Sequence, residues 1–172
     1  MAKSSGKDAK VLPTRNDVPD NAKQVSIGIL QGCLVDTIDL YNATRQAHWN
    51  VKGPHFGALH ELFEQFYTDL AVASDDLAER IVQIGGIASG TTQTLASQTR
   101  LPPYPTDLLA GMDHVAALAE RYAQVAKTLR AGIEETEEAG DADTADLLTE
   151  QSRAMDKKLW MLEAHLGPDK AR

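Results

Sequence analysis

Residues 48–79 read HWNVKGPHFGALHELFEQFYTDLAVASDDLAE, and this stretch decides how the rest of the chain is arranged. It contains two pairs of side chains that can bind metal, His60 with Glu64 and Asp75 with Glu79, and the members of each pair are four residues apart. Residues with this spacing lie one turn apart on the same face of a helix. At about 100° per residue, all four side chains fall within roughly 100° of one another around the axis. The stretch therefore predicts a helix that carries them on one stripe.

The two pairs are too far apart along this helix to bind the same metal ion. Fifteen residues separate His60 from Asp75, which is roughly 22 Å at the helical rise, whereas ligand atoms lie about 2.0–2.3 Å from a bound metal. A second copy of the helix, laid antiparallel about a two-fold axis near residues 69–70, brings each pair opposite the other pair of its partner. Two-fold contacts are self-complementary. We therefore hypothesise two identical metal sites, each shared between two subunits.

Ordinary roles remain open for these residues. His48 extends the apolar stripe of the preceding helix near its end, so it also suits a half-buried structural histidine. Asp75 and Glu79 also suit the surface of an acidic protein. His55 and His114 have no evident partner in the sequence and are not expected to bind metal.

The ligand types narrow the chemistry of such a site. One or two imidazoles with carboxylates, no thiolate and room for water suit Fe(II) or Mn(II), and Zn(II) also fits this set. Open coordination positions beside an oxidant favour redox chemistry over a closed structural site. Trp49, next to His48, is expected to be a core or interface aromatic, and the alternatives are that it packs over the site or takes up stray oxidising equivalents.

Length, charge and cysteine content limit the class of protein. The chain has 172 residues, which suits one domain with a sizeable core, and a net charge of -8, which by itself opposes nucleic-acid binding. Cys33 is the only cysteine, so neither a disulfide framework nor a thiolate metal site is expected. No run approaches the roughly 20 apolar residues of a membrane helix, and the start MAKSSGKDAK lacks the apolar centre of a signal peptide. We therefore expect a cytoplasmic protein without a membrane partner.

Apolar residues that recur at spacings of three and four predict an all-α fold. Helices are expected from about Asn21 to Asn50, from His55 or Phe56 to Ile84, from the cap Thr106 after Pro105 to Gly140, and from the DADTAD run at 141–146 to the stop Gly167-Pro168. Residues 85–105, rich in glycine and proline, suit a long crossover that carries a short helix at 91–98. One long crossover between helices two and three gives a ferritin-like four-helix bundle.

Both ends of the chain are expected to lie outside this bundle, which spans residues 21–167. Residues 168–172 form a short C-terminal tail. Residues 1–20 are polar, contain two prolines and show no periodicity, so they are expected to form a mobile N-terminal tail. Its basic side chains are Lys3, Lys7, Lys10 and Arg15. In a single copy such a tail is an ordinary solubilising terminus, whereas many copies on one particle bind multivalently.

The segments HWNVKGPHF, LHELFE and DDLAERIVQIGG, followed by DTADLLTEQSRAMDKKLWMLEAHL, resemble in order and spacing the Dps proteins, the DNA-binding proteins from starved cells, also called mini-ferritins. The resemblance covers roughly residues 23–167. It implies a hollow homo-dodecamer of four-helix bundles, built from two-fold dimers, with a ferroxidase centre at each two-fold interface. The implied ligands are His48, His60 and Glu64 from one subunit and Asp75 and Glu79 from the other.

The resemblance also implies the reaction and the route of the metal. Paired Fe(II) is oxidised with hydrogen peroxide in preference to dioxygen, and the ferric product mineralises in the cavity. Many members of the family have Asp at the position of Glu64, and the longer side chain could alter the second iron position. Asp141, Asp143 and Asp146 match the acidic three-fold pores through which Fe(II) is thought to enter. From the sequence itself, stabilisation of the helix dipole is the alternative role for these three acids.

Two functions from different classes follow. The first is a ferroxidase and iron store that protects DNA from oxidative damage. The second is a nucleoid-compacting, sequence-independent DNA binder with weak or no ferroxidase activity, which acts through the basic N-terminal tail or, failing that, through Lys170 and Arg172. Such binding depends strongly on salt.

Overall fold

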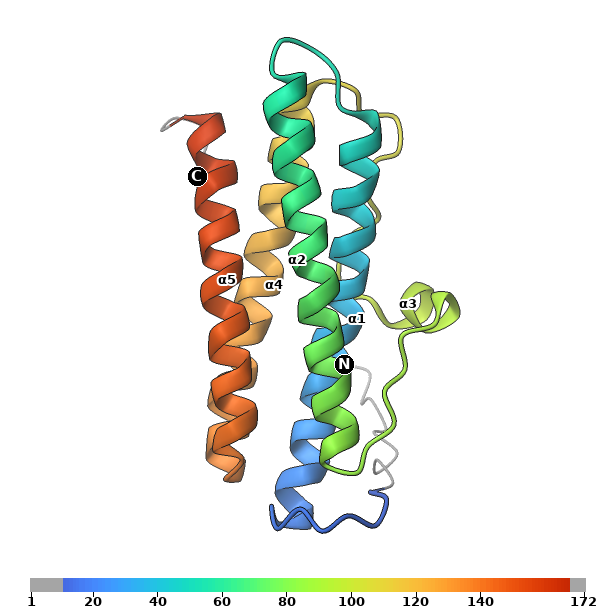
Figure 1. Cartoon of the computed structure of the whole chain (residues 1–172), viewed down its shortest axis with the longest axis vertical. Coiled ribbons are helices and arrows are strands. Elements are labelled where there is room, and N and C mark those ends of the chain that lie inside the picture. The colour runs from blue at the N-terminus through green and yellow to red at the C-terminus, as the bar shows by residue number, and fades with distance from the viewer. Residues whose placement is uncertain (1–10, 168–172) are drawn as a thin grey trace, which may run out of the picture.

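The computed structural model describes residues 11–167, and the regular elements of this part of the chain are all helices. They are α1 (Asp20–Asn50), α2 (Phe56–Gln83), α3 (Thr92–Gln98), α4 (Gly111–Ala139) and α5 (Ala142–Leu166). Figure 1 shows the four long helices side by side in one elongated bundle. The predicted all-α four-helix bundle is therefore confirmed.

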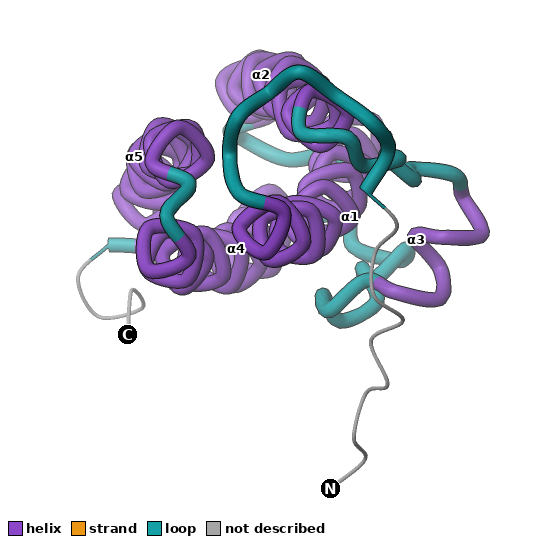
Figure 2. The backbone as a smooth tube through the Cα atoms, turned by 90° about the horizontal axis from the view of Figure 1, so that it is seen from below, coloured by secondary structure: helices purple, strands orange, loops and turns teal. Residues whose placement is uncertain are grey.

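The crossover between α2 and α4 determines the connectivity. α1 and α2 form one antiparallel pair and α4 and α5 form another (Figure 1). The connection from α2 to α4 runs along the bundle and carries α3, which lies outside the bundle beside α1. In the end-on view of Figure 2, α4 lies between α1 and α5, and α2 lies against α1. Helices α2 and α4 therefore run in the same direction.

Glycines and one aspartate set the boundaries of the long helices. Gly85 follows the end of α2 with φ 89°, and Gly140 follows α4 with φ 92°, a left-handed conformation that glycine adopts without the steric cost of a side chain. Asp141 then caps α5, because its carboxylate accepts a hydrogen bond from the main-chain N–H of Thr144. The boundaries predicted for α1, α2, α3 and α5 agree closely with the structure.

The start of α4 differs from the prediction. Thr106 does not cap it, since the helix begins only at Gly111. The intervening main chain pairs with the turn that follows α1: the N–H of Lys52 donates to the carbonyl of Leu109 at 2.8 Å, and the N–H of Gly111 donates to the carbonyl of Lys52 at 3.2 Å. These bonds flank Ala110, whose backbone is extended (φ -69°, ψ 131°), and the helix begins only after it. They also fasten the α1–α2 turn to the start of α4.

The segment before α1 is attached to the bundle. The N–H of Leu12 donates to the carbonyl of Gly85 at 2.7 Å, and Lys23 Nζ donates to the carbonyl of Asn16 at 2.7 Å. The expectation of a tail that is free as far as residue 20 is therefore wrong for residues 11–19. Arg15 is exposed, and Lys3, Lys7 and Lys10 lie outside the described residues.

The core fills the space between the four long helices. It is built around fully buried large side chains that include Leu30 of α1, Phe63 and Leu77 of α2 and Tyr122 of α4. Cys33 belongs to this core, and burial raises the pKa of its thiol to about 11, so this thiol is expected to be unreactive. No helix of the described chain is long and apolar enough to cross a membrane.

Candidate metal centre

His48 and His60 meet where the end of α1 faces the first turns of α2. Their rings stack with centroids 3.8 Å apart and planes 21° apart. His48 Nδ1 lies 2.9 Å from the carbonyl oxygen of His60, and His60 Nδ1 lies 3.0 Å from the carbonyl oxygen of His48. A carbonyl only accepts, so each Nδ1–H donates, and in the neutral form of such a ring the lone pair lies on Nε2. Both imidazoles are thereby oriented as metal ligands usually are.

Aromatic and acidic side chains surround this pair. The ring of Phe56 lies 5.1 Å from that of His60, and the ring of Tyr67 lies 5.2 Å from that of His48 in an edge-on arrangement. The phenol of Tyr67 donates to Glu64 Oε1 at 3.4 Å. His48 is only 8% exposed, whereas His60 is half-buried and Glu64 is exposed. One subunit therefore presents two oriented imidazoles with a carboxylate one helical turn away.

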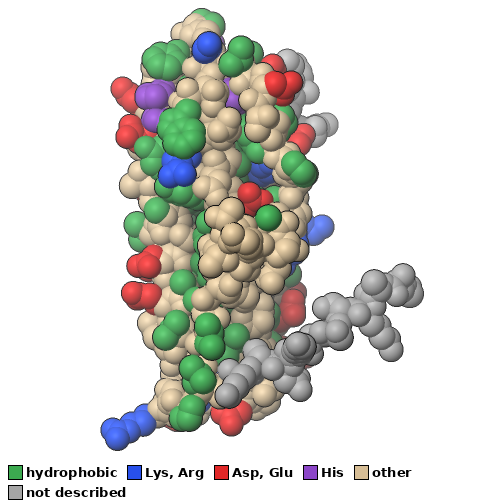
Figure 3. Space-filling view, turned by 90° about the vertical axis from the view of Figure 1, so that its right-hand side faces the viewer, with side chains coloured by type: hydrophobic (Ala, Val, Ile, Leu, Met, Phe, Trp, Pro, Cys, Tyr) green, Lys and Arg blue, Asp and Glu red, His purple; other side chains and the backbone are tan. Residues whose placement is uncertain are grey.

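Asp75 and Glu79 stand apart from the histidines, farther along α2. Both are exposed, and neither forms an ion pair within residues 11–167. In the same part of the chain, no three His, Cys, Asp or Glu side chains are close enough together to hold a metal ion. Figure 3 shows histidines near one end of an edge of the molecule, with acidic side chains beside them and lower along that edge. A single subunit thus carries the expected ligands in two separate sets.

Comparison with known proteins decides the family. The chain matches the family described as "Ferritin-like domain" over residues 27–171. It is 51% identical over 157 residues to the "DNA protection during starvation protein" of Agrobacterium fabrum, covering 91% of this chain and 97% of the relative. The chain belongs to the Dps family. This membership confirms the resemblance seen in the sequence.

Solved structures agree with the assignment. DpsA14 from Streptomyces coelicolor has a TM-score of 0.88 and 33% identity, covering 94% of this Dps chain and 95% of its own. The Dps protein from Vibrio cholerae has a TM-score of 0.85 and 28% identity, covering 92% of this chain and 99% of its own. The Vibrio protein is described as a member of a broad superfamily of ferritin-like diiron-carboxylate proteins.

The three acids expected at a pore of this Dps chain differ in their surroundings. Asp141 is 1% exposed, and its Oδ1 accepts from Arg80 Nη2 at 2.7 Å and its Oδ2 from Thr144 Oγ1 at 2.6 Å. The assignment of Asp141 to the pore lining is therefore wrong, because its carboxylate is buried and occupied. Asp143 and Asp146 are exposed, and their place in a pore stays a prediction.

Opposing effects act on the pKa of Asp141. Burial by itself raises this pKa, whereas the hydrogen bonds from Thr144 and the positive charge of Arg80 lower it, and the net result lies below the ordinary value. The carboxylate is thus ionised in the folded protein at neutral pH. The helix dipole can be inferred from the local sequence, whereas the partner Arg80 cannot, since nothing local links it to a residue in the α4–α5 turn.

Trp49 is 62% exposed and lies outside the core of the subunit. The guanidinium carbon of Arg45 lies 4.9 Å from the centroid of the Trp49 ring and 4.9 Å from that of the Tyr41 ring. Arg45 Nη1 also donates to the hydroxyl of Tyr41 at 2.8 Å. Of the two environments expected for this tryptophan, the core is wrong, and an interface stays a prediction.

His55 and His114, which are not expected to bind metal, lie outside the stacked pair of His48 and His60. His55 is exposed just before α2. His114 is 1% exposed, and its Nδ1 lies 2.7 Å from the hydroxyl of Tyr104. Burial lowers the pKa of His114, so it is a neutral side chain that fastens the crossover to α4.

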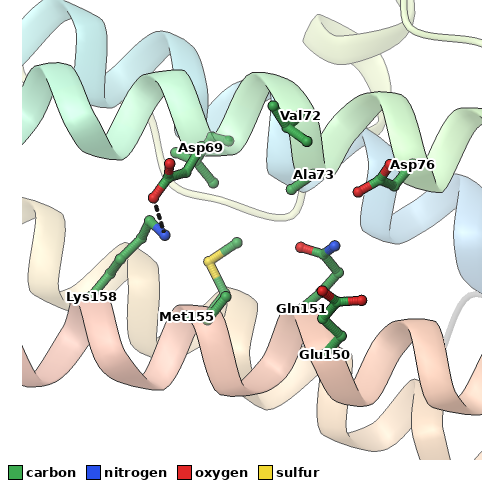
Figure 4. Close-up of a pocket in the computed structure, with 10 residues that line it drawn as sticks. Asp69, Val72, Ala73, Asp76, Glu150, Gln151, Met155 and Lys158 are labelled. Atoms are coloured by element: carbon green, nitrogen blue, oxygen red, sulfur yellow. Dashed lines mark ion pairs between the residues drawn. The ribbon is translucent and has the colours of Figure 1, made fainter.

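A separate pocket of about 250 Å³ lies between α2 and α5, away from the histidines. Lys158 Nζ lies 2.8 Å from Asp69 Oδ2. Figure 4 shows this ion pair at one end of the pocket, and Asp76 near Glu150 and Gln151 toward the other. None of the expected iron ligands lines this pocket. Its charged groups give this face of the bundle a mixed polar surface.

Proposed function

We propose that this Dps chain is a ferroxidase and iron-storage protein, which oxidises Fe(II), holds the ferric product as a mineral in a hollow dodecamer and so protects DNA from oxidative damage. The observation that carries this proposal is the reciprocal bonding of His48 and His60. Each ring is hydrogen-bonded through Nδ1 to the main chain of the other residue, which leaves the lone pair of each Nε2 atom for a metal ion.

The second set of ligands comes, in this proposal, from the partner subunit across a two-fold axis near residues 69–70. Exposed apolar side chains on α2 support this interface. Phe56, Val72 and Val82 are 50%, 60% and 59% exposed. Val82 falls at about 40° relative to His60, within the ligand stripe, and Phe56 and Val72 flank the stripe at about -40° and 120°. An apolar and acidic stripe of this kind suits burial against a second copy of itself.

Iron is the substrate of the proposed reaction. Imidazole Nε2 atoms and carboxylate oxygens together suit Fe(II) and leave positions for water and oxidant. Two Fe(II) ions each give up one electron, and hydrogen peroxide takes up both electrons and two protons to form two water molecules. Because both electrons reach peroxide together, the one-electron step that releases hydroxyl radical is avoided. We therefore propose hydrogen peroxide as the preferred oxidant.

The test begins with anaerobic titration of the purified protein with Fe(II), followed by stoichiometric hydrogen peroxide, with iron absorbance and particle mass recorded together. The expected result is saturable Fe(II) binding and fast oxidation on a particle of about twelve subunits, a closed and symmetric assembly of two-fold dimers. His48→Ala/His60→Ala protein should bind little Fe(II). His55→Ala is the matched control, because His55 is an exposed histidine outside the stacked pair. Oxidation no faster than in buffer would contradict the proposal.

DNA binding is the second candidate function, and one observation favours it. The N–H of Leu12 donates to the carbonyl of Gly85, and Lys3, Lys7 and Lys10 precede this point in the sequence. The Agrobacterium relative is also named for DNA protection. Many weak basic segments on one particle bind a polyanion multivalently, with strong dependence on salt. In this reading the protein acts in the cytoplasm in association with the nucleoid.

Deletion of residues 1–10 separates the two functions. Gel retardation of DNA at low salt should be lost while Fe(II) oxidation stays unchanged. Arg15→Gln is the companion variant, since Arg15 is exposed on the fastened segment. Retained DNA binding after the deletion would move the contact to other residues, with Lys170 and Arg172 next to be tested.

A further inference from the structure

Tyr67 contacts two of the proposed ligands from the same position on α2. Its phenol donates to Glu64 Oε1 at 3.4 Å, and its ring meets the ring of His48 at 5.2 Å with planes 78° apart. Tyr67 follows Glu64 by three residues, so the two side chains are neighbours on the surface of the helix. The residue therefore stands between the imidazole from α1 and the carboxylate from α2.

The ring of Tyr67 is held in place from α1. Tyr41 packs against it in a T-shaped arrangement, with centroids 5.9 Å apart and planes 89° apart. Tyr41 is itself fixed, because its hydroxyl accepts a hydrogen bond from Arg45 Nη1 at 2.8 Å. Edge-to-face aromatic contacts stabilise such positions. The phenol oxygen of Tyr67 thus has a defined location relative to His48.

Glu64 has no comparable support. It is exposed, and Tyr67 is the only hydrogen-bond donor to its carboxylate within residues 11–167. A glutamate has one more rotatable bond than an aspartate, so an unsupported carboxylate here samples more positions. A ligating carboxylate is normally held by a hydrogen bond of its own.

We propose that Tyr67 is a positioning residue for iron binding, whose phenol holds Oε1 of Glu64 and leaves Oε2 free to bind the metal. The inference rests on the proposed ferroxidase function and extends it to a residue that is not a ligand. Hydrogen bonds of this kind are often long before the substrate is bound and tighten afterwards. Loss of such a partner typically weakens metal affinity by about 10–100-fold.

The test compares Tyr67→Phe with the wild-type particle. The substitution keeps the ring between Tyr41 and His48 and removes only the hydroxyl. Anaerobic calorimetry with Fe(II) should show affinity at least about tenfold weaker. The visible absorption of bound Co(II), used as a spectroscopic probe, should also change, because the bound carboxylate changes its geometry. Tyr104→Phe is the matched control: it removes a phenol hydroxyl that bonds His114, which is not a proposed ligand, and Fe(II) affinity should stay at the wild-type value.

A double-mutant cycle with Glu64→Asp isolates the contact. The shorter side chain withdraws the carboxylate from the phenol, so Tyr67→Phe should have no further effect on Fe(II) affinity in the Glu64→Asp background. Equal Fe(II) affinity of wild type and Tyr67→Phe would overturn the role of Tyr67 and leave the proposed function untouched. An equal loss of Fe(II) affinity in both backgrounds would do the same. A wild-type particle that binds no Fe(II) would overturn the proposed function as well, so the two failures are distinguishable.

Discussion

The guanidinium of Arg80 lies 2.7 Å from the buried carboxylate of Asp141, and this ion pair joins α2 to the turn between α4 and α5. The side chain of Asp141 is 0% exposed and that of Arg80 is 10% exposed. Arg80 Nε also donates to Thr144 Oγ1 at 2.9 Å. The two helical hairpins of the bundle are thus connected at this end by charged and hydroxyl groups as well as by apolar packing.

Asp141→Ala should lower the free energy of unfolding by about 3–5 kcal/mol, because it leaves the buried Arg80 charge without its partner and removes the cap of α5. Denaturant unfolding at fixed subunit concentration measures the change. Asp156→Ala is the matched control. It breaks the Arg130–Asp156 pair, whose side chains are 50% and 51% exposed, and an exposed pair contributes only about 0–1 kcal/mol. Equal losses in the two variants would contradict a special role for the buried pair.

The same ion pair predicts how stability depends on pH. The pKa of Asp141 is lower in the folded protein than its ordinary value, so the folded state binds fewer protons at this group. Its contribution is therefore fully present above the ordinary carboxyl pKa of about 3.9 and is lost as the pH falls through the lower folded value. The difference in unfolding free energy between wild type and Asp141→Asn should be constant above about pH 5 and shrink below about pH 4. A difference that grows on acidification would contradict this assignment.

Shared sites predict complementation between two inactive variants. A His48→Ala/His60→Ala subunit keeps Asp75 and Glu79, and an Asp75→Ala/Glu79→Ala subunit keeps both histidines. Random assembly of equal amounts makes half of the dimers mixed, and one of the two sites in each mixed dimer is intact, so about a quarter of the wild-type fast oxidation should return. Each variant assembled alone is the control. No recovery in mixed particles would contradict a site shared between two subunits.

Two glycines predict opposite effects of the same substitution. A Cβ atom on Gly111 would lie 2.6 Å from Leu59 Cδ1, whereas a Cβ atom on Gly28 meets nothing within 4 Å. Gly111→Ala should therefore destabilise the fold by about 1–3 kcal/mol through overpacking. Gly28→Ala, in an exposed part of α1, should stabilise it by about 0.5–1 kcal/mol. Thermal unfolding of both variants tests the pair, and a stabilised Gly111→Ala would show that α4 can shift away from α2.

The sequence predicted most of the fold because its helix boundaries are local. Glycines 85, 140 and 167 each follow the last residues of a helix and have positive φ. A glycine after a run of apolar residues at helical spacing therefore predicts the helix end, and the apolar spacing itself identifies the buried stripe. The predicted start of α4 was wrong, because the actual start depends on a pairing between Lys52 and Ala110, which are far apart in sequence. A candidate cap such as Thr106 carries no information about that pairing.

The candidate site was predictable in part for the same reason. The spacing of His60 and Glu64 places them on one face of a helix, and Tyr67 continues that face, so its contact with Glu64 was within reach of the same argument. The stacking of His48 on His60 and the burial of Asp141 depend instead on how separate helices meet. Residue type alone did not distinguish Asp141, which is buried and forms an ion pair with Arg80, from the exposed Asp143.

In the proposed site, the crossed bonds between His48 and His60 would make the turn between α1 and α2 a determinant of metal affinity. Each imidazole is aligned by the main chain of the opposite helix, so both rings are ordered when this hairpin folds, before any ion arrives. The conformational entropy of the two ligands is then lost during folding and not again on binding. Local opening of residues 51–55 would misalign both rings at once. Amide hydrogen exchange in this turn and occupancy of the site by iron should therefore change together.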